Sequence, residues 1–237
     1  MEPIGTIRQL ARYPVKSMRG EALPSAALTA KGVPEDRRYA FVQTASRSAF
    51  PWLTARELPE MLCYRPILEA SDSEKPKVTV ITPDGRKLPV ESEKLRQELE
   101  ARSGRAIFLV NHHRGRYDAA VMSVISRQTI AQIAEESGTE ENAWRFRPNL
   151  LVDLRSGAGY EEQNWIGHVL RVGSTARIAI NEPDNRCVII TLDPETAASS
   201  PAILRYVAQH HDRRAGVYGT VLAPGETRVG DPVWLEP

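Results

Sequence analysis

Residues 77–90 read Lys-Val-Thr-Val-Ile-Thr-Pro-Asp-Gly-Arg-Lys-Leu-Pro-Val, and this stretch indicates the fold class most clearly. Two short runs of strand-forming residues, 77–82 and 87–90, flank the pair Asp84-Gly85. Because this pair tolerates the positive φ angles of a tight primed turn, the stretch predicts a β-hairpin. Such a hairpin favours a fold built largely from antiparallel strands.

The rest of the chain repeats this pattern of short apolar or alternating runs divided by Gly, Pro and Asp. That pattern is typical of a β-dominated chain. Further strands are predicted over residues 4–10, 22–28, 39–43, 106–110, 149–153, 169–172, 176–180, 187–192, 217–222 and 232–235.

Three helices are predicted between these strands, so the fold class is mainly β with a few α-helices (α+β). Each predicted helix follows a serine that can cap its first turn. The first runs from Ser92 to about Ser103 and stops at Gly104, the second runs from Ser126 to Gly138, and the third starts at Ser200-Pro201.

Length and composition exclude several classes of protein. The chain has 237 residues, 41% of them hydrophobic, and a formal net charge of +1. A near-neutral balance argues against nucleic acid as the main partner. The N-terminus lacks a secretory signal, and no apolar run approaches the roughly 20 residues that cross a bilayer. We therefore expect a cytoplasmic protein without a membrane partner.

The chain has two cysteines, Cys63 and Cys187, and neither lies in a metal-binding spacing. Cys187 follows the polar turn Pro183–Arg186 and precedes an apolar run, which predicts that its thiol lies at the mouth of a strand. A neighbouring guanidinium, here Arg186, favours the thiolate, which binds metals and attacks electrophiles. The alternative is a small buried thiol, the commoner role of an isolated cysteine.

Several motifs follow one another in a fixed order, and through them the chain resembles the MOSC superfamily, named for the C-terminal domain of molybdenum cofactor sulfurase. The resemblance implies an N-terminal MOSC β-barrel domain over residues 1–112, packed on a MOSC β-barrel domain over residues 113–237. The motifs are Tyr13-Pro-Val-Lys-Ser17, Asp36-Arg37, Arg145-Phe-Arg-Pro-Asn149, Glu161 to Trp165, Arg186-Cys187 and Gly216-Val-Tyr218.

The resemblance also implies a site for molybdenum cofactor (Mo-molybdopterin). In the related amidoxime-reducing proteins, a cysteine at the position of Cys187 ligates molybdenum, so Cys187 is the implied metal ligand and catalytic residue. A soft thiolate suits a metal that is already bound by sulfur, and basic groups suit a pterin phosphate. The implied cofactor contacts are Lys16, Ser17, Arg37, Arg147, Asn149, Arg186 and Tyr218.

The implied activity is that of an oxidoreductase reducing small N-hydroxylated compounds. Electrons would come from a separate protein, such as a ferredoxin, a flavoprotein reductase or a cytochrome b5-like protein, because two cysteines cannot hold a cluster. One alternative is a carrier of persulfide sulfur or of the cofactor, without turnover, since an arginine-activated thiolate also suits sulfur transfer. Another is a β-barrel binding module whose cysteine is structural.

Overall fold

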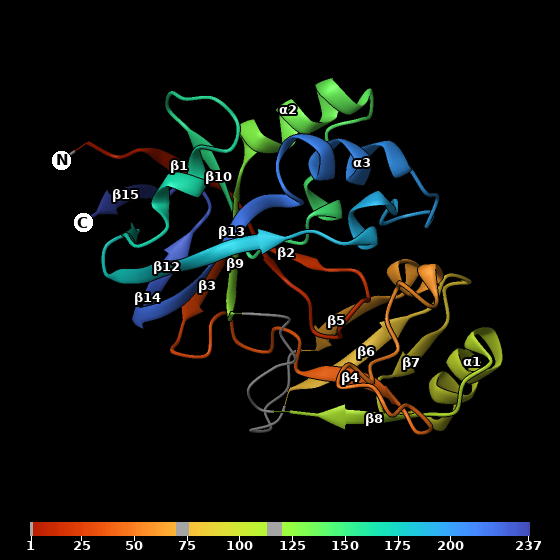
Figure 1. Ribbon diagram of the computed structural model, residues 1–237. Helices are drawn as coiled ribbons and strands as arrows, with labels where there is room; N and C mark the ends of the chain where they lie inside the picture. The colour runs from red at the N-terminus through yellow and green to blue at the C-terminus, as the bar shows by residue number, and fades with distance from the viewer. Residues whose placement is uncertain (1, 70–75, 113–119) are drawn as a thin grey trace.

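The computed structural model describes residues 2–69, 76–112 and 120–237 and shows a barrel with a smaller lobe beside it (Figure 1). Seven strands close the barrel in the order β10-β9-β13-β12-β11-β15-β1, and β1 pairs with β10. Apolar side chains fill its interior. The strands are β1 (Gly5–Arg12), β9 (Met122–Ser126), β10 (Leu150–Leu154), β11 (Val169–Val172), β12 (Ala176–Asn185), β13 (Arg214–Ala223) and β15 (Pro232–Glu236).

The N-terminal segment is part of this barrel. β1 lies between β10 and β15, and Gly5 permits a close approach there, because an added Cβ would lie 2.3 Å from the Asp153 carbonyl oxygen. The two-domain division at residues 112 and 113 stays a prediction, and residues 113–119 lie outside the described residues. Two further pairings tie this segment to the barrel: β2 (Glu21–Leu23) joins β1, and β3 (Ser25–Leu28) joins β14 (Gly225–Arg228).

The smaller lobe has its own apolar core and contains the predicted hairpin. Residues 79–81 pair with residues 87–89, which confirms the hairpin. Its turn is not of the primed type that the Asp84-Gly85 pair predicts, because Gly85 adopts a positive φ of 86° and Asp84 does not, and the Gly85 amide donates to the Thr82 carbonyl over 2.9 Å. Two separate sheets surround this core together with helix α1 (Glu93–Ser103) and the 3-10 helix η1 (Pro59–Cys63). One sheet pairs β4 (Tyr39–Gln43) with β8 (Ile107–Asn111), and the other is formed by β5 (Arg65–Glu69), β6 (Lys77–Ile81) and β7 (Lys87–Pro89).

All three predicted helices are confirmed. The Ser92 and Ser126 hydroxyls accept hydrogen bonds from the first turns of α1 and α2 (Arg127–Ser137), whereas the Ser200 side chain makes no such bond to α3 (Pro201–His210). Helices α2 and α3 pack together on the outside of the barrel (Figure 1). Within the described ranges, no helix is long and apolar enough to cross a membrane.

The strand predicted over residues 187–192 is wrong. This segment forms the 3-10 helix η4 (Val188–Thr191), and β12 instead continues to Asn185. The Thr191 hydroxyl donates to the Val188 carbonyl over 2.7 Å, and Ile190 is buried against α3. A short β-branched run fits either structure locally, so packing against α3 decides between them.

Other boundaries differ less. The predicted strand 22–28 divides into β2 and β3, and three strands were not predicted: β5, β9 and β14. The remaining short helices are η2 (Ala143–Arg145) and η3 (Glu161–Trp165).

Glu162 fastens η3 to the barrel. Its carboxylate oxygen Oε2 accepts hydrogen bonds from the hydroxyls of Ser126 and Thr129, each over 2.8 Å. The side chain is fully buried, and this desolvation raises the pKa of Glu162 above its ordinary value. The folded state therefore resists ionisation of this group.

A Glu162→Gln variant tests whether ionisation of the buried Glu162 carboxyl destabilises the folded state. Because the folded-state pKa lies above the unfolded one, the ionised carboxylate destabilises the wild type increasingly as pH rises above the unfolded value of about 4.3. Glutamine carries no charge and retains an acceptor for both hydroxyls. The melting temperature of the variant, relative to wild type, should therefore rise by a few degrees between pH 5 and pH 8.

The control for this experiment is Glu161→Gln, at the exposed neighbouring position on η3. Its melting temperature relative to wild type should stay constant over the same pH range. If the melting-temperature difference between Glu162→Gln and wild type is also constant over this pH range, burial of the ionised carboxylate does not destabilise the protein.

Candidate functional site

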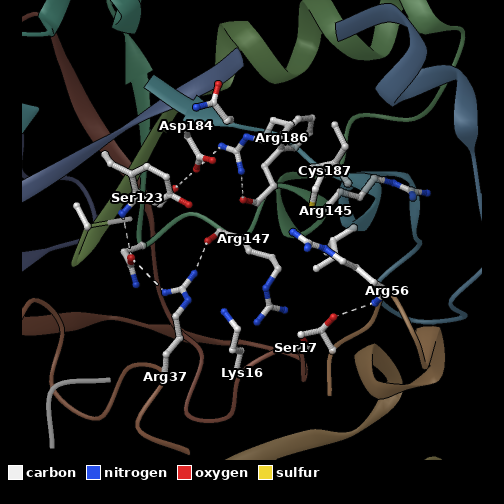
Figure 2. A pocket seen from close by; sticks show the side chains of 18 of the residues that line it. Lys16, Ser17, Arg37, Arg56, Ser123, Arg145, Arg147, Asp184, Arg186 and Cys187 are labelled. Atoms are coloured by element: carbon white, nitrogen blue, oxygen red, sulfur yellow. Dashed lines mark hydrogen bonds and ion pairs between the residues drawn. The ribbon is translucent and has the colours of Figure 1, made fainter. Parts of the chain in front are cut away.

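A pocket of about 770 Å³, including its open mouth, lies where the smaller lobe meets the barrel (Figure 2). The structure brings together all the site residues inferred from the sequence, although their chemical roles stay predictions. These residues are Lys16, Ser17, Arg37, Arg147, Asn149, Arg186, Cys187 and Tyr218.

The lining of this pocket is strongly basic. Among the described residues that line it, Asp184 is the one carboxylate, against six cationic side chains. Several like charges around one hollow create a positive potential that attracts anions. The cationic side chains are Lys16, Arg37, Arg56, Arg145, Arg147 and Arg186.

Tyr13 orients two of these cations. Its ring is fully buried and lies 4.8 Å from the Arg37 guanidinium and 4.3 Å from that of Arg147. The Tyr13 hydroxyl donates to the Pro148 carbonyl over 3.1 Å, and burial raises its pKa. Arg37 also donates to the Arg147 carbonyl over 3.1 Å. Both guanidinium groups are thus held in place before any ligand arrives.

Three pocket residues adopt left-handed backbone conformations that non-glycine residues rarely use. The φ angles are 65° at Ser17, 48° at Arg37 and 54° at Arg147. Each such conformation costs about 1 kcal/mol or more and persists where the surroundings enforce it. At Arg37 the backbone amide donates to the Tyr13 carbonyl over 2.6 Å, which helps to hold this conformation.

Asn149 connects three barrel strands next to the pocket. Its side-chain nitrogen donates to the Ala11 carbonyl over 3.2 Å, and its oxygen accepts from the Ser123 amide over 3.1 Å. These bonds tie β1 and β9 to the start of β10. The side chain is almost fully buried, so its amide serves the fold as well as the pocket wall.

Arg186 and Asp184 form a buried ion pair, with 2.9 Å between Nη2 and Oδ2. Arg186 donates further bonds to the carbonyls of Ala215 and Phe146, over 2.6 and 2.7 Å. Asp184 accepts from the Ser123 hydroxyl over 3.0 Å, and burial raises its pKa despite these contacts. Arg186 therefore contributes charge to the pocket while its Nε and Nη1 donors bind the protein, and Nη2 pairs with Asp184 by charge without donating a hydrogen bond within the described residues.

Cys187 is half-buried in the pocket wall, directly before η4. Arg145 fixes this segment from the other side. Its guanidinium donates to the Thr191 carbonyl over 3.0 Å and pairs with Asp193 at 3.2 Å. The position of the thiol thus depends on the first arginine of the Arg145-Phe-Arg147 motif, whose role the sequence did not reveal.

The sequence also missed other residues of the lining. Arg145 lies inside the motif Arg145-Phe-Arg-Pro-Asn149, and Asp184 lies in the polar turn that precedes Cys187, so these positions were an available signal. No motif marks the residues that the segment between β4 and η1 brings to the pocket. These are Phe50, Thr54 and Arg56.

The fold and the pocket define a class of protein: a seven-stranded barrel with a smaller lobe, enclosing a cationic pocket that presents one cysteine. The chain belongs to the MOSC domain family. The model of the MOSC domain matches residues 110–234, and that of the MOSC N-terminal beta barrel domain matches residues 4–119.

Known proteins that are similar to this chain include an amidoxime-reducing component and a bacterial protein of known structure. The mitochondrial amidoxime-reducing component 1 of Mus musculus is 25% identical, over 99% of this chain and 83% of its own length. The crystal structure of the YuaD protein from Bacillus subtilis has a TM-score of 0.50 and 12% identity, and the match covers 97% of this chain and 93% of the other. The second likeness concerns the fold alone.

The position of the Arg186 side chain requires glycine at residue 216. Its φ is 78°, and an added Cβ would lie 2.8 Å both from Arg186 Nη2 and from the Val124 carbonyl oxygen. Gly104, at the end of α1, has a φ of 68° but nothing within 4 Å of an added Cβ. The two glycines share the backbone conformation and differ in the space around them.

We expect Gly216→Ala to destabilise the protein more than Gly104→Ala. Both variants incur the left-handed backbone cost of about 1 kcal/mol. Gly216→Ala adds overpacking against Arg186 and Val124, a further loss of about 1–3 kcal/mol. Urea unfolding measures both losses, and equal values would show that Arg186 and β9 move aside freely.

We expect Arg145→Lys to speed alkylation of Cys187. Lysine keeps the charge but cannot reproduce the forked contacts to Thr191 and Asp193, so η4 should open more often. Loss of one such bond predicts about a threefold to tenfold increase in rate. Mass spectrometry after iodoacetamide treatment gives the rate, in a Cys63→Ser background from a host without molybdenum cofactor.

The matched control is Arg96→Lys, which alters an arginine that pairs with Glu93 and Glu100 on α1. It should leave the rate of Cys187 alkylation unchanged. An unchanged rate in Arg145→Lys would mean that Arg145 does not restrain η4.

Proposed function

We propose that this protein binds molybdenum cofactor in the cationic pocket and reduces small N-hydroxylated compounds. The observation that carries the proposal is one cysteine thiol and six basic side chains on the wall of a single pocket. Membership in the MOSC family supports the cofactor, and similarity to an amidoxime-reducing component supports the reaction.

The residues present fit such a cofactor. A thiolate suits a metal whose other ligands are sulfur, and basic side chains suit a phosphate. Arg145 Nε is buried and has no hydrogen-bond partner in the described part of the chain, so an anionic ligand would satisfy a donor that the protein leaves unpaired. The proposal assigns the remaining metal ligands to the pterin, since the described residues include no cluster of three or more His, Cys, Asp or Glu suited to a metal.

When bound, the cofactor supplies the two-electron reduction of the substrate N–O bond. Cys187 would hold the metal, and Lys16, Arg37 and Arg147 would pair with the pterin phosphate. Asp184 lies in the pocket wall, and Tyr218 contributes a hydrogen bond to its carboxylate. Because burial raises the pKa of Asp184, its carboxyl binds a proton more readily than an exposed one, and the reaction consumes protons.

The proposal includes a separate electron-donor protein and a cytoplasmic location. The ferredoxin, flavoprotein reductase and cytochrome b5-like donors remain the classes to test, with reduction of an amidoxime as the readout.

Metal and pterin analysis of wild type and Cys187→Ser tests the site directly. After expression with molybdate in a host that makes the cofactor, wild type should contain both molybdenum and pterin. Cys187→Ser should lose most of its molybdenum and its reductase activity, because a serine hydroxyl is a poorer ligand for a soft metal centre. Cys63→Ser is the matched control and should retain both. Equal molybdenum in all three proteins would refute the ligand role of Cys187.

The carrier alternative gives a different result in the same preparation. A persulfide on Cys187 would appear in mass spectra as one additional sulfur that cyanide releases. That adduct, together with an absence of amidoxime reduction by molybdenum-loaded protein, would replace the proposed reaction with sulfur transfer.

A further inference from the structure

The pocket mouth places an aromatic ring between two cations. The Phe50 ring lies 5.4 Å from Lys16 Nζ and 5.0 Å from the Arg56 guanidinium. All three side chains line the pocket. Lys16 is buried, Phe50 is half-buried and Arg56 is exposed, so the three lead from the interior to solvent. We call Lys16, Phe50 and Arg56 the rim.

The backbone between Phe50 and Arg56 is anchored directly after the ring. The Gln43 amide donates to the Pro51 carbonyl over 2.8 Å, and the Leu53 amide donates to the Phe41 carbonyl over 2.9 Å. The Thr54 hydroxyl then donates to the Glu57 carboxylate over 2.7 Å. Strand β4 and this turn thus hold the ring and the guanidinium in a defined place.

The rim also lies close to the proposed metal ligand. Ala55, next to Arg56, packs in one apolar cluster with Leu192 and Ile189 from the segment that follows Cys187. Ile189 itself lines the pocket. Figure 2 shows Arg56 and Cys187 on the same side of the cavity. A small molecule reacting near Cys187 would lie in a cavity that the rim also lines.

We propose that the rim selects the substrate and binds flat aromatic compounds that carry a carboxylate. This inference rests on the proposed function, because it names the class of N-hydroxylated acceptor. The edge of the half-buried Phe50 ring offers a contact to an aromatic substrate, and the exposed Arg56 guanidinium offers positive charge to a carboxylate. The surrounding positive charge disfavours a cationic substrate.

The reaction with such a substrate balances as follows. An aromatic amidoxime takes up two electrons from reduced methyl viologen and two protons, its N–O bond breaks, and the oxygen leaves as water while the amidine remains. The carboxylate on the far side of the ring takes no part in the chemistry, so it reports on recognition alone.

The test compares benzamidoxime with 4-carboxybenzamidoxime on molybdenum-loaded protein at low ionic strength. Wild type should show the higher kcat/KM for the carboxylate, and Arg56→Gln should lower the ratio of the two values about tenfold, the loss of one charge-assisted hydrogen bond. Arg56→Lys should retain part of the preference. Phe50→Leu should raise KM for both compounds, and all variants should hold as much molybdenum as wild type.

Binding of benzoate and of neutral benzamide, measured by calorimetry, gives a readout that needs no turnover. Wild type should bind benzoate more tightly than benzamide, and Arg56→Gln should lose that difference. The matched control is Arg86→Gln, an exposed arginine that pairs with Asp84 and Glu98 in the smaller lobe. It should behave as wild type in both experiments.

The outcomes separate the two proposals. If Arg56→Gln leaves both the ratio of the two kcat/KM values and the benzoate affinity unchanged, the rim does not select the substrate. This holds even if both amidoximes are reduced. Arg56-dependent benzoate binding without reduction of either amidoxime would overturn the proposed function and support the rim.

Discussion

The concentration of positive charge around one pocket is the constraint on which the surrounding structure depends. Cations that face one another across a hollow repel, and each must be held by carbonyl oxygens, a carboxylate or an aromatic ring. Asp184 and two backbone carbonyls hold Arg186, while Tyr13 lies against Arg37 and Arg147. Because these partners are supplied by the protein, the charged side chains stay in place without a ligand. Binding of an anion therefore carries little further entropy cost for ordering them.

Barrel closure is what assembles these partners. β1 closes the ring of strands against β10 and thereby brings the Tyr13 to Ser17 segment beside the start of β10. Asn149 reinforces that junction through its bonds to Ala11 and Ser123. The smaller lobe completes the pocket from the opposite side, where Ala55 packs on Leu192. Residues far apart in the sequence therefore meet because of one strand pairing and one small apolar contact.

The sequence predicted those turns and helices that depend on interactions between neighbouring residues. The hairpin around Asp84-Gly85, and the helices that begin at Ser92 and Ser126, depend on neighbours a few residues away and appear as predicted, although the turn itself is not a primed one. The strand predicted over residues 187–192 failed because packing of Ile190 against α3 outweighs the propensity of a β-branched run. Phe50 and Arg56 could not be identified at all, because their place in the pocket follows from long-range packing that no local pattern encodes.

Arg186 illustrates how one residue can serve both the fold and the site. Its guanidinium bonds are directed to Ala215, Phe146 and Asp184, yet its charge still contributes to the potential inside the pocket. Lys16 and Arg147 act on the same space from other walls. Three of the six cations already pair with a carboxylate, Arg186 with Asp184, Arg145 with Asp193 and Arg37 with Asp36. A bound anion would add negative charge inside the pocket itself. Because such an anion binds the folded state alone, occupancy of the pocket and stability of the barrel are thermodynamically linked.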